Sequence, residues 1–257
     1  MTSTSIVPSL IIAHATAISI LTIIFNGASK FHNVTDALGF YGVYHRNPIN
    51  QVIHFFGVPC IIWSLFIFLA HLTLPIPILN HIHVNIPFAP THLVNYATIL
   101  TIGYILFYIK IDPFGGTLYV PFAYFMYVTA VSMTIKDQQC AKNNETYKLV
   151  KEKEKSKIRK SSWIGTGKAL RFAFMVHVAG WYVQVHPGHG IFEGAKPAVM
   201  QSIGGALTSA PLFAYYEGLW VLGLNKELQE KTKALVDVYT KQMCDNGEVM
   251  RACADYN

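Results

Sequence analysis

The sequence has 257 residues, of which 52% are hydrophobic and only 13% are charged, and its mean hydropathy is +0.34. Soluble proteins carry charge on roughly a quarter of their residues. This chain therefore has too few charged side chains to cover a water-soluble globule, and much of its surface is expected to face lipid. An ordinary soluble domain is excluded.

The net charge of +6 is concentrated in a basic run that extends from Lys136 to Arg171. Such a run can bind nucleic acid, but next to apolar segments it is typical of a loop that faces the cytosol. We predict a cytosolic loop over residues 136–168 and no nucleic-acid partner. The four cysteines lack Cys-x-x-Cys spacing, and we predict neither a zinc site nor a disulfide framework among them: Cys60, Cys140, Cys244 and Cys253.

The first predicted element is an apolar helix over residues 6–25, about as long as a bilayer is thick. No basic region precedes it, so we interpret it as a retained helix and not as a cleaved signal peptide. Five further apolar segments follow, over residues 52–74, 93–109, 114–135, 172–185 and 203–224. Strands would leave unpaired edges in lipid. The predicted fold is therefore all-α, a polytopic membrane helical bundle of about five to six hydrophobic helices.

After the last apolar segment, Leu228, Leu235, Val238 and Met243 recur at helical spacing among charged residues. This pattern predicts an amphipathic helix on the membrane surface, with a partner-binding helix as the alternative. The predicted organisation is a hydrophobic extension (1–37), a membrane catalytic domain (38–225) and an amphipathic tail (226–257). The basic loop and the tail are expected to face the cytosol, and the chain near His45 and His189 is expected to face the opposite side.

A polar face begins where Asn47 and Pro48 signal the start of a helix. Polar side chains recur there at i, i+3, i+4 and i+7: Asn47, Asn50, Gln51 and His54. Pro59 predicts a kink just beyond them. Polar groups at membrane depth are costly, so their gathering on one face beside a kink indicates a site. The alternative is that they only satisfy a helix end.

A second polar face carries His177, Trp181 and Gln184 at i, i+4 and i+7. Pro187 is predicted to end the regular helix, and Gly188 and Gly190 flank His189. Irregular backbone at membrane depth is tolerated where it lines a cavity, which makes His189 a candidate metal ligand. Neutral imidazole suits iron, zinc, copper and nickel alike, so the spacing does not choose the metal.

Glu193, four residues after His189, has three possible roles. It could complete a site of two histidines and one carboxylate, hydrogen-bond a ligating histidine, or pair with Lys196. A further group, His81, His83 and His92, lies in a proline-rich linker. The spacing His81-x-His83 resembles that of a metal pair, but the linker is expected to be exposed and lacks supporting polar groups, so a structural role is favoured and a metal pair is the alternative.

The two polar faces resemble the motifs of the fungal 2-hydroxypalmitate dioxygenase family. The first motif is Tyr44-His45-Arg46-Asn47-Pro48 with Asn50, His54 and Val58-Pro59. The second comprises Trp181, Gln184, Gly188-His189-Gly190, Phe192-Glu193 and Lys196-Pro197-Ala198, followed by Ala210-Pro211 and Glu217. The similarity covers residues 38–220. The basic insertion around residues 151–160 exceeds the family core, and His186 stands where an apolar residue is expected.

The resemblance implies an Fe(II)-dependent enzyme of the endoplasmic reticulum membrane that uses O₂ to convert a 2-hydroxy fatty acid to the acid one carbon shorter plus CO₂. In fungal members this reaction serves breakdown of the sphingoid base phytosphingosine. The family's metal-binding histidines match His45, His54, His177 and His189. His45, His54, His189 and Glu193 are the expected catalytic residues, and Asn50, Gln184 and Lys196 are expected to contact the substrate; Arg46 could also attract its carboxylate.

Two other interpretations compete with this one. A di-iron membrane hydroxylase or desaturase needs more histidines, including His-His pairs, and the sequence has none. A non-enzymatic lipid carrier or membrane scaffold would need no metal, so the iron content of the purified protein distinguishes it from both enzymes.

Overall fold

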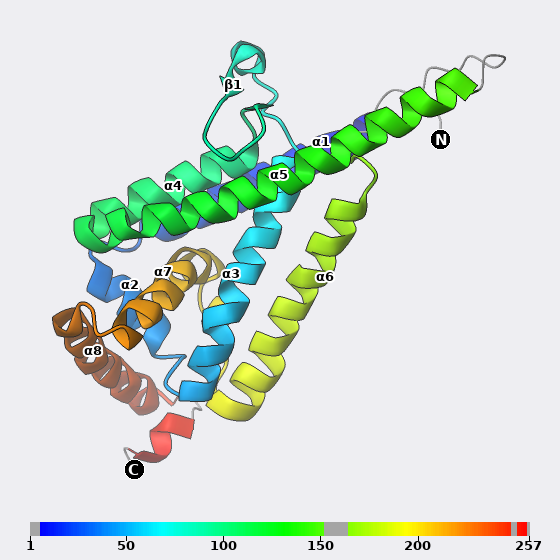
Figure 1. Cartoon of the computed structure of the whole chain (residues 1–257). Helices are drawn as coiled ribbons and strands as arrows, with labels where there is room; N and C mark the ends of the chain where they lie inside the picture. Colours follow the sequence, from blue (N-terminus) through cyan, green and yellow to red (C-terminus); the bar gives the residue numbers. More distant parts are fainter. Residues whose placement is uncertain (1–5, 152–163, 248–250, 256–257) are drawn as a thin grey trace. The chain divides into compact units, whose positions relative to one another are not determined.

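Figure 1 shows the computed structural model, which describes residues 6–151, 164–247 and 251–255. These residues form eight α-helices, short 3-10 and π-helical segments and two strands of two residues each, so the predicted all-α class is confirmed. The α-helices are α1 (Ile6–Ala28), α2 (Val34–Gly42), α3 (Pro48–Ala70), α4 (Tyr96–Ile111), α5 (Pro113–Lys151), α6 (Lys168–Val183), α7 (Ile203–Val221) and α8 (Lys226–Asp245).

Each of the six predicted apolar segments coincides with one helix, namely α1, α3, α4, α5, α6 and α7. Within the described residues, three helices are long and apolar enough to cross a membrane: Pro8–Ala28 of α1, the whole of α3, and Pro113–Asn143 of α5. The architecture is that of a membrane helical bundle, and three of its six apolar helices meet this criterion of length and composition.

Helix α5 runs on to Lys151, so the first part of the predicted basic loop is helical. Lys, Gln, Ala and Glu are good helix formers, which explains the extension. Residues 152–163 lie outside the described chain. Where the description resumes, the Asp137 carboxylate accepts hydrogen bonds from the Thr166 hydroxyl and from the backbone N–H of Gly167 at 3.1 Å, directly before α6.

The chain divides into two units. The first comprises residues 1–17, 63–102 and 121–177. Within it the Trp63 indole donates to the Thr129 hydroxyl at 2.9 Å, which joins α3 to α5. In the proline-rich linker, β1 (His83–Val84) pairs antiparallel with β2 (His92–Leu93), and the His92 Nε2 lies 2.7 Å from the Tyr127 hydroxyl. The linker histidine His92 thus belongs to a structural network.

The second unit comprises residues 18–62, 103–120 and 178–257, and it includes His45, His54 and His189. Helices α1 and α7 approach closely there, because a Cβ on Gly27 would lie only 2.1 Å from the Gly204 carbonyl carbon. The Thr208 hydroxyl donates to the Ile24 carbonyl at 2.8 Å, and the Tyr108 hydroxyl donates to the Thr208 carbonyl at 2.8 Å. Helices α1, α4 and α7 are therefore joined in this unit.

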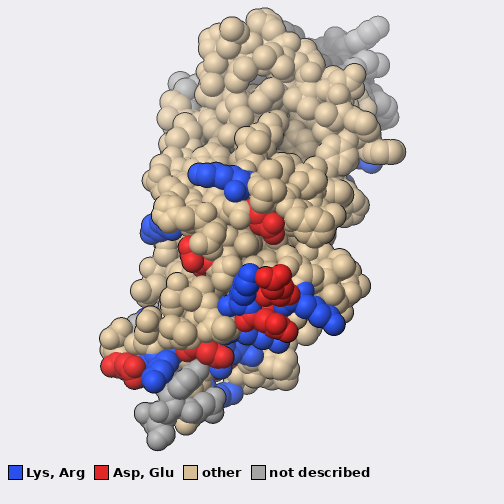
Figure 2. Space-filling model, turned by 90° about the vertical axis from the view of Figure 1, so that its left-hand side faces the viewer, with Lys and Arg blue, Asp and Glu red and all other residues tan. Residues whose placement is uncertain are grey.

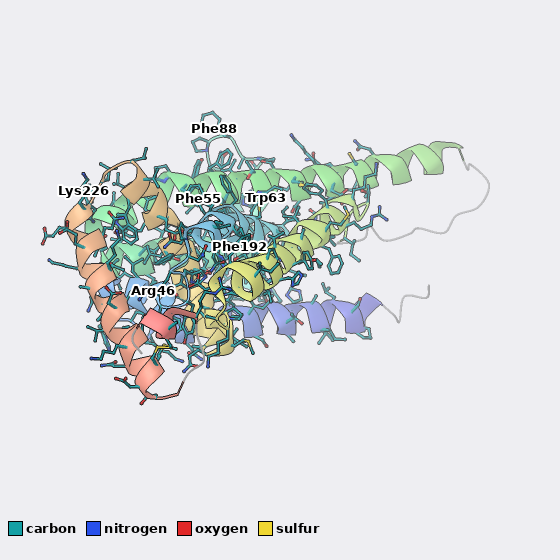
Figure 3. All side chains as sticks on the ribbon, turned by 90° about the horizontal axis from the view of Figure 1, so that it is seen from below. Arg46, Phe55, Trp63, Phe88, Phe192 and Lys226 are labelled. Atoms are coloured by element: carbon teal, nitrogen blue, oxygen red, sulfur yellow. A yellow bond between two sulfur atoms is a disulfide. The ribbon has the colours of Figure 1, made fainter. Side chains whose placement is uncertain are left out.

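Helix α8 packs against α2 in this unit, with one face buried: Leu228, Thr232, Val236 and Thr240. Its charged residues gather on the outer side, in the lower part of the face shown in Figure 2. Arg46, the residue after His45, points to α8 (Figure 3) and lies 2.9 Å from the Asp237 carboxylate. The prediction that the tail and His45 lie on opposite sides is therefore wrong, because α8 contacts the His45 segment directly.

Cys244 and Cys253 form a disulfide, so the prediction of no disulfide is also wrong. The two cysteines are nine residues apart and meet because η5 (Arg251–Asp255) folds back beside the end of α8. No spacing motif encodes such a return of the chain. Cys60 and Cys140 are free and exposed.

Candidate metal centre

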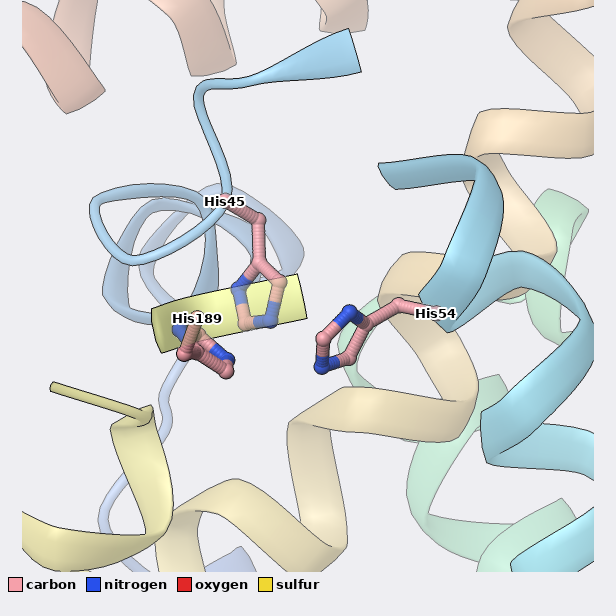
Figure 4. Close-up of side chains that lie close together, drawn as sticks. All are labelled: His45, His54 and His189. Carbon is pink, nitrogen blue, oxygen red and sulfur yellow. The ribbon is translucent and has the colours of Figure 1, made fainter. Parts of the chain in front are cut away.

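Three histidines from separate segments meet in the second unit (Figure 4). His45 follows α2, His54 lies in α3, and His189 lies in the π-helix η3 (Gln184–Glu193). Their ligand atoms all lie within 4.8 Å of one another, and all three side chains are buried. The rings stand nearly perpendicular to each other, with centroids 4.2 to 5.0 Å apart. Among the described residues, this is the one group of three or more side chains with metal-binding geometry.

His45 and His54 are oriented in the same way. The His45 Nδ1 donates to the Tyr41 carbonyl at 2.8 Å, and the His54 Nδ1 donates to the Asn50 carbonyl at 2.9 Å. A carbonyl oxygen only accepts, so the proton of each neutral ring is on Nδ1 and the lone pair is on Nε2. Metal-binding histidines commonly have this second hydrogen bond, which fixes the tautomer and the ring direction.

His189 is presented by an interruption of helical geometry. The α-helix α6 ends at Val183, and the chain continues as the π-helix through Pro187. Proline has no N–H with which to bond the carbonyl four residues earlier, which is that of Val183. The sequence analysis predicted that the regular helix ends at Pro187. In the structure the α-helix changes to a wider π-helix before Pro187, and the π-helix continues past it. This π-helical segment is ten residues long, and π-helical interruptions of α-helices are rare and occur frequently at functional sites.

The charge state of these rings suits metal binding. Burial lowers the pKa of His45 well below 6.5, and the neighbouring His54 and His189 lower it further. Burial also lowers the pKa of His189 to about 4. Both rings are therefore neutral at physiological pH. The His45 Nε2 and the His189 Nδ1 are buried and have no hydrogen-bond partner within the protein. Buried polar atoms are rarely left unpaired, and a metal ion would satisfy both.

Glu193 joins the two histidine motifs. Its carboxylate accepts hydrogen bonds from the backbone N–H groups of Arg46 at 2.9 Å and Asn47 at 3.0 Å, and from the Asn50 side-chain amide at 2.9 Å. These donors lie at the start of α3, where the helix dipole favours a negative charge. Glu193 is not part of the three-histidine group, and both of its oxygens hold the His45 segment beside the segment that carries His189.

The other predicted site residues have different surroundings. His177 does not join the group; its Nδ1 lies 2.9 Å from the Ser64 hydroxyl in the first unit. Arg46 bonds to Asp237 and Thr240 of α8. His186 is exposed, with its ring 5.5 Å from that of Tyr182. Lys196 is half-buried after the π-helix.

A partly open pocket lies beside the three histidines. His45, His54, His189, Tyr41 and Gln184 line its polar part. The remaining wall is largely apolar and includes Val58, Ile61, Ile62, Val199, Ala206 and Leu207. Of the three predicted substrate contacts, Gln184 lines this cavity, whereas Asn50 and Lys196 do not. A mostly apolar pocket that is also lined by candidate metal ligands suits a molecule with an apolar chain and a polar head.

Tyr41 is a site residue that the sequence reasoning missed. Its ring stacks on His45 with centroids 3.9 Å apart and planes 11° apart, and it lines the cavity. The signal was its position four residues before His45, which places both side chains on one side of a helical turn.

Gly188 and Gly190 allow a matched prediction. A Cβ on Gly188 would lie 2.5 Å from the Asn50 Oδ1 and 3.4 Å from the His54 Cε1, whereas one on Gly190 would meet nothing closer than 3.6 Å. Neither glycine has a positive φ, so neither position requires the conformational freedom of glycine. At Gly188 a glycine is needed because the backbone lies close to the Asn50 side chain. Gly188→Ala should lower metal affinity about tenfold, as changes around metal ligands do, and Gly190→Ala should not. Metal titration of both variants tests this, and equal affinities would contradict it.

Comparison with known proteins shows the family of the chain. The family model described as "2-hydroxy-palmitic acid dioxygenase Mpo1-like" matches residues 31–219. The chain belongs to this family. Within it, the 2-hydroxy-palmitic acid dioxygenase MPO1 of Saccharomyces cerevisiae is 24% identical over 192 residues, which cover 75% of this chain and 83% of the yeast protein. No solved structure matches the chain. The family region contains all three histidines and Glu193, but not α8 or the residues after it.

Proposed function

We propose that the protein is an Fe(II)-dependent dioxygenase of the endoplasmic reticulum membrane that shortens 2-hydroxy fatty acids by one carbon. The reaction is R–CH(OH)–COOH + O₂ → R–COOH + CO₂ + H₂O. The observation that carries the proposal is the buried three-histidine group that lines a mostly apolar pocket, in a chain of the Mpo1-like family.

His45 and His54 would hold the metal through Nε2, and His189 through Nδ1. Three neutral imidazoles are a donor set that iron accepts, although zinc and copper accept it as well. Ferrous iron, when bound, supplies the redox chemistry that reaction with O₂ requires. The hydrogen bonds from the His45 and His54 rings to backbone carbonyls keep the two rings in place, and Tyr41 covers one face of His45.

The apolar cavity wall is the proposed site of the acyl chain. Burial of each CH₂ group contributes about 0.8 kcal/mol, so a long chain gains far more from this wall than a short one. Gln184, whose amide nitrogen donates to the Gly180 carbonyl at 3.0 Å, has its side chain at the polar part of the cavity. Its side-chain oxygen is the proposed contact of the 2-hydroxy acid head.

The direct test is incubation of the purified, metal-depleted protein with 2-hydroxypalmitate and O₂, with Fe(II) or with Zn(II), followed by measurement of the fifteen-carbon acid. Fe(II) should restore activity, and Zn(II) should bind without restoring it because zinc has no redox chemistry. Product formation with zinc alone, or without O₂, would show a non-oxidative reaction. Purified protein that neither contains nor binds iron would favour a lipid carrier.

Ala206→Phe is expected to shift the choice of substrate toward shorter acids. Ala206 is buried in α7 and lines the cavity, so a phenyl ring there would take space from the acyl chain. The ratio of kcat/KM for 2-hydroxypalmitate to that for 2-hydroxyoctanoate should fall roughly 10-fold or more, since each methylene in an apolar pocket is worth about 1–3 kcal/mol. Ile203→Phe, on the exposed face of the same helix, is the control. An unchanged ratio in Ala206→Phe would place the acyl chain elsewhere.

A further inference from the structure

The tail after the family region contacts both segments that carry the candidate metal ligands. On the first segment, the Arg46 guanidinium donates to the Asp237 carboxylate at 2.9 Å and to the Thr240 hydroxyl at 3.0 Å. Arg46 directly follows His45. The ion pair is partly exposed, and such pairs contribute little to stability, but the contact shows that the His45 segment lies against α8.

On the second segment, Arg251 binds the end of the π-helix that carries His189. Its guanidinium donates to the carbonyls of Phe192 at 2.9 Å and Ile191 at 3.1 Å, and its backbone N–H donates to the Gly194 carbonyl at 3.2 Å. The last carbonyls of a helix lack partners within the helix. One planar guanidinium with several donors can satisfy two of them together.

Gly194 makes this contact possible. It ends the π-helix with φ +64°, a left-handed conformation that favours glycine. A Cβ at this position would lie 3.0 Å from the Arg251 Nε and 3.1 Å from its Cβ. The Arg251 side chain therefore lies directly against the backbone that ends the His189 segment.

The disulfide ties Arg251 to the rest of the tail. Cys253 follows Arg251 by two residues and is bonded to Cys244 in the last turn of α8. Because α8 is itself packed against α2, the short η5 segment is anchored to the same unit as the three histidines. Without the bond, the noncovalent contacts of η5 would have to hold it there.

We propose that Arg251 is a positioning residue for the metal centre and that the Cys244–Cys253 disulfide holds it in place. Arg251 fixes the end of the π-helix, and Glu193 in that helix fixes the start of α3, so His189 stays beside His45 and His54. This inference rests on the proposed function in one respect: it requires that the three histidines bind a metal, but not that the reaction is a dioxygenation. It assigns the tail, which lies outside the matched family region, a role in ordering that site.

The proposal makes the site sensitive to dithiol reductants. A dithiol attacks the Cys244–Cys253 bond through a mixed disulfide. The protein S–S bond breaks and two protein S–H groups form, while the two thiols of the reductant become a disulfide. Two electrons and two protons thus pass from the reductant to the protein, and η5 is then held by its noncovalent contacts alone.

The first experiment measures hydrogen exchange of the amides in residues 184–194 of the full-length, metal-free protein. Arg251→Ala should speed this exchange about tenfold, as loss of one or two hydrogen bonds from a locally opening segment would, and so should reduction of the wild-type disulfide. Arg251→Lys should give an intermediate rate, because lysine lacks the planar fork that binds two carbonyls. Lys241→Ala, an exposed basic residue of α8, is the control and should match the wild type. Wild-type exchange in both Arg251→Ala and the reduced protein would overturn the proposal, whether or not the protein binds a metal.

The second experiment measures Co(II) affinity in a Cys60→Ser/Cys140→Ser background, which keeps the disulfide and removes the free thiols. Reduction, Arg251→Ala, and Cys244→Ser with Cys253→Ser should each weaken binding about tenfold, as loss of supporting contacts around metal ligands does. Combining Arg251→Ala with the cysteine changes should add little, because both act through one contact. Additive losses, or a response to reductant in the protein that lacks Cys244 and Cys253, would contradict the proposed mechanism. Wild-type protein that fails to bind any metal would refute the proposed function, and the exchange experiment would still decide the role of Arg251.

Discussion

Alanine in place of His45, His54 or His189 should abolish the proposed dioxygenase activity while the protein still inserts into membranes. Each substitution removes one of the three clustered imidazoles. Changes to residues that merely support a ligand cost 10–100-fold in metal affinity, so loss of a ligand should cost about 100-fold or more. In the metal-free protein, His45→Ala and His54→Ala each remove one ring hydrogen bond to a carbonyl, worth about 1 kcal/mol. Metal content, activity and membrane insertion are the measurements.

His186→Phe is the matched control for these variants. His186 lies three residues before His189, but it is exposed and outside the three-histidine group. Its replacement should leave metal content and activity at the wild-type level. Metal loss as large as that of His189→Ala would make His186 a ligand. Full activity with retained iron in any two of the three alanine variants would remove the proposed metal site.

Glu193→Gln is expected to have the second largest effect. The Glu193 carboxylate is only 6% exposed and accepts three hydrogen bonds at the start of α3. Glutamine has nearly the same shape, but its side-chain NH₂ cannot accept, so at least one N–H donor loses its partner. Hydrogen bonds to charged groups contribute about 1.5–3 kcal/mol each, and the free energy of unfolding should fall by about 2–4 kcal/mol. Metal affinity should fall roughly tenfold, because Glu193 aligns the two histidine segments.

Denaturant unfolding and metal titration of Glu193→Gln test this prediction. Glu227→Gln, which changes an exposed glutamate paired with Lys231, is the control and should alter neither property. A loss of stability with unchanged metal affinity would show that Glu193 stabilises the start of α3 but does not align the metal site. A loss of metal as complete as that of the histidine variants would instead indicate that Glu193 is itself a ligand.

The sequence by itself was sufficient for the features that depend on neighbouring residues. Helix α3 begins at Pro48, as predicted, because the Asn47 side chain accepts hydrogen bonds from the backbone N–H groups of Ile49 and Asn50. The apolar segments became helices because uninterrupted apolar residues in lipid must satisfy their own backbone groups. His54 and Asn50 were recognised together, since helical spacing places them on one face.

Only the tertiary structure decided which of the candidate residues meet. It brought His189 to His45 and His54, left His177 beside Ser64, and placed Glu193 on backbone groups 146 and 147 residues earlier in the chain. The tertiary structure also shows that η5 folds back so that the disulfide forms, and that α8 packs beside the segment that carries His45. Local periodicity determines which side of a helix a residue occupies. Which segments pack together depends on how whole helices fit one another, and no short stretch of sequence contains that information.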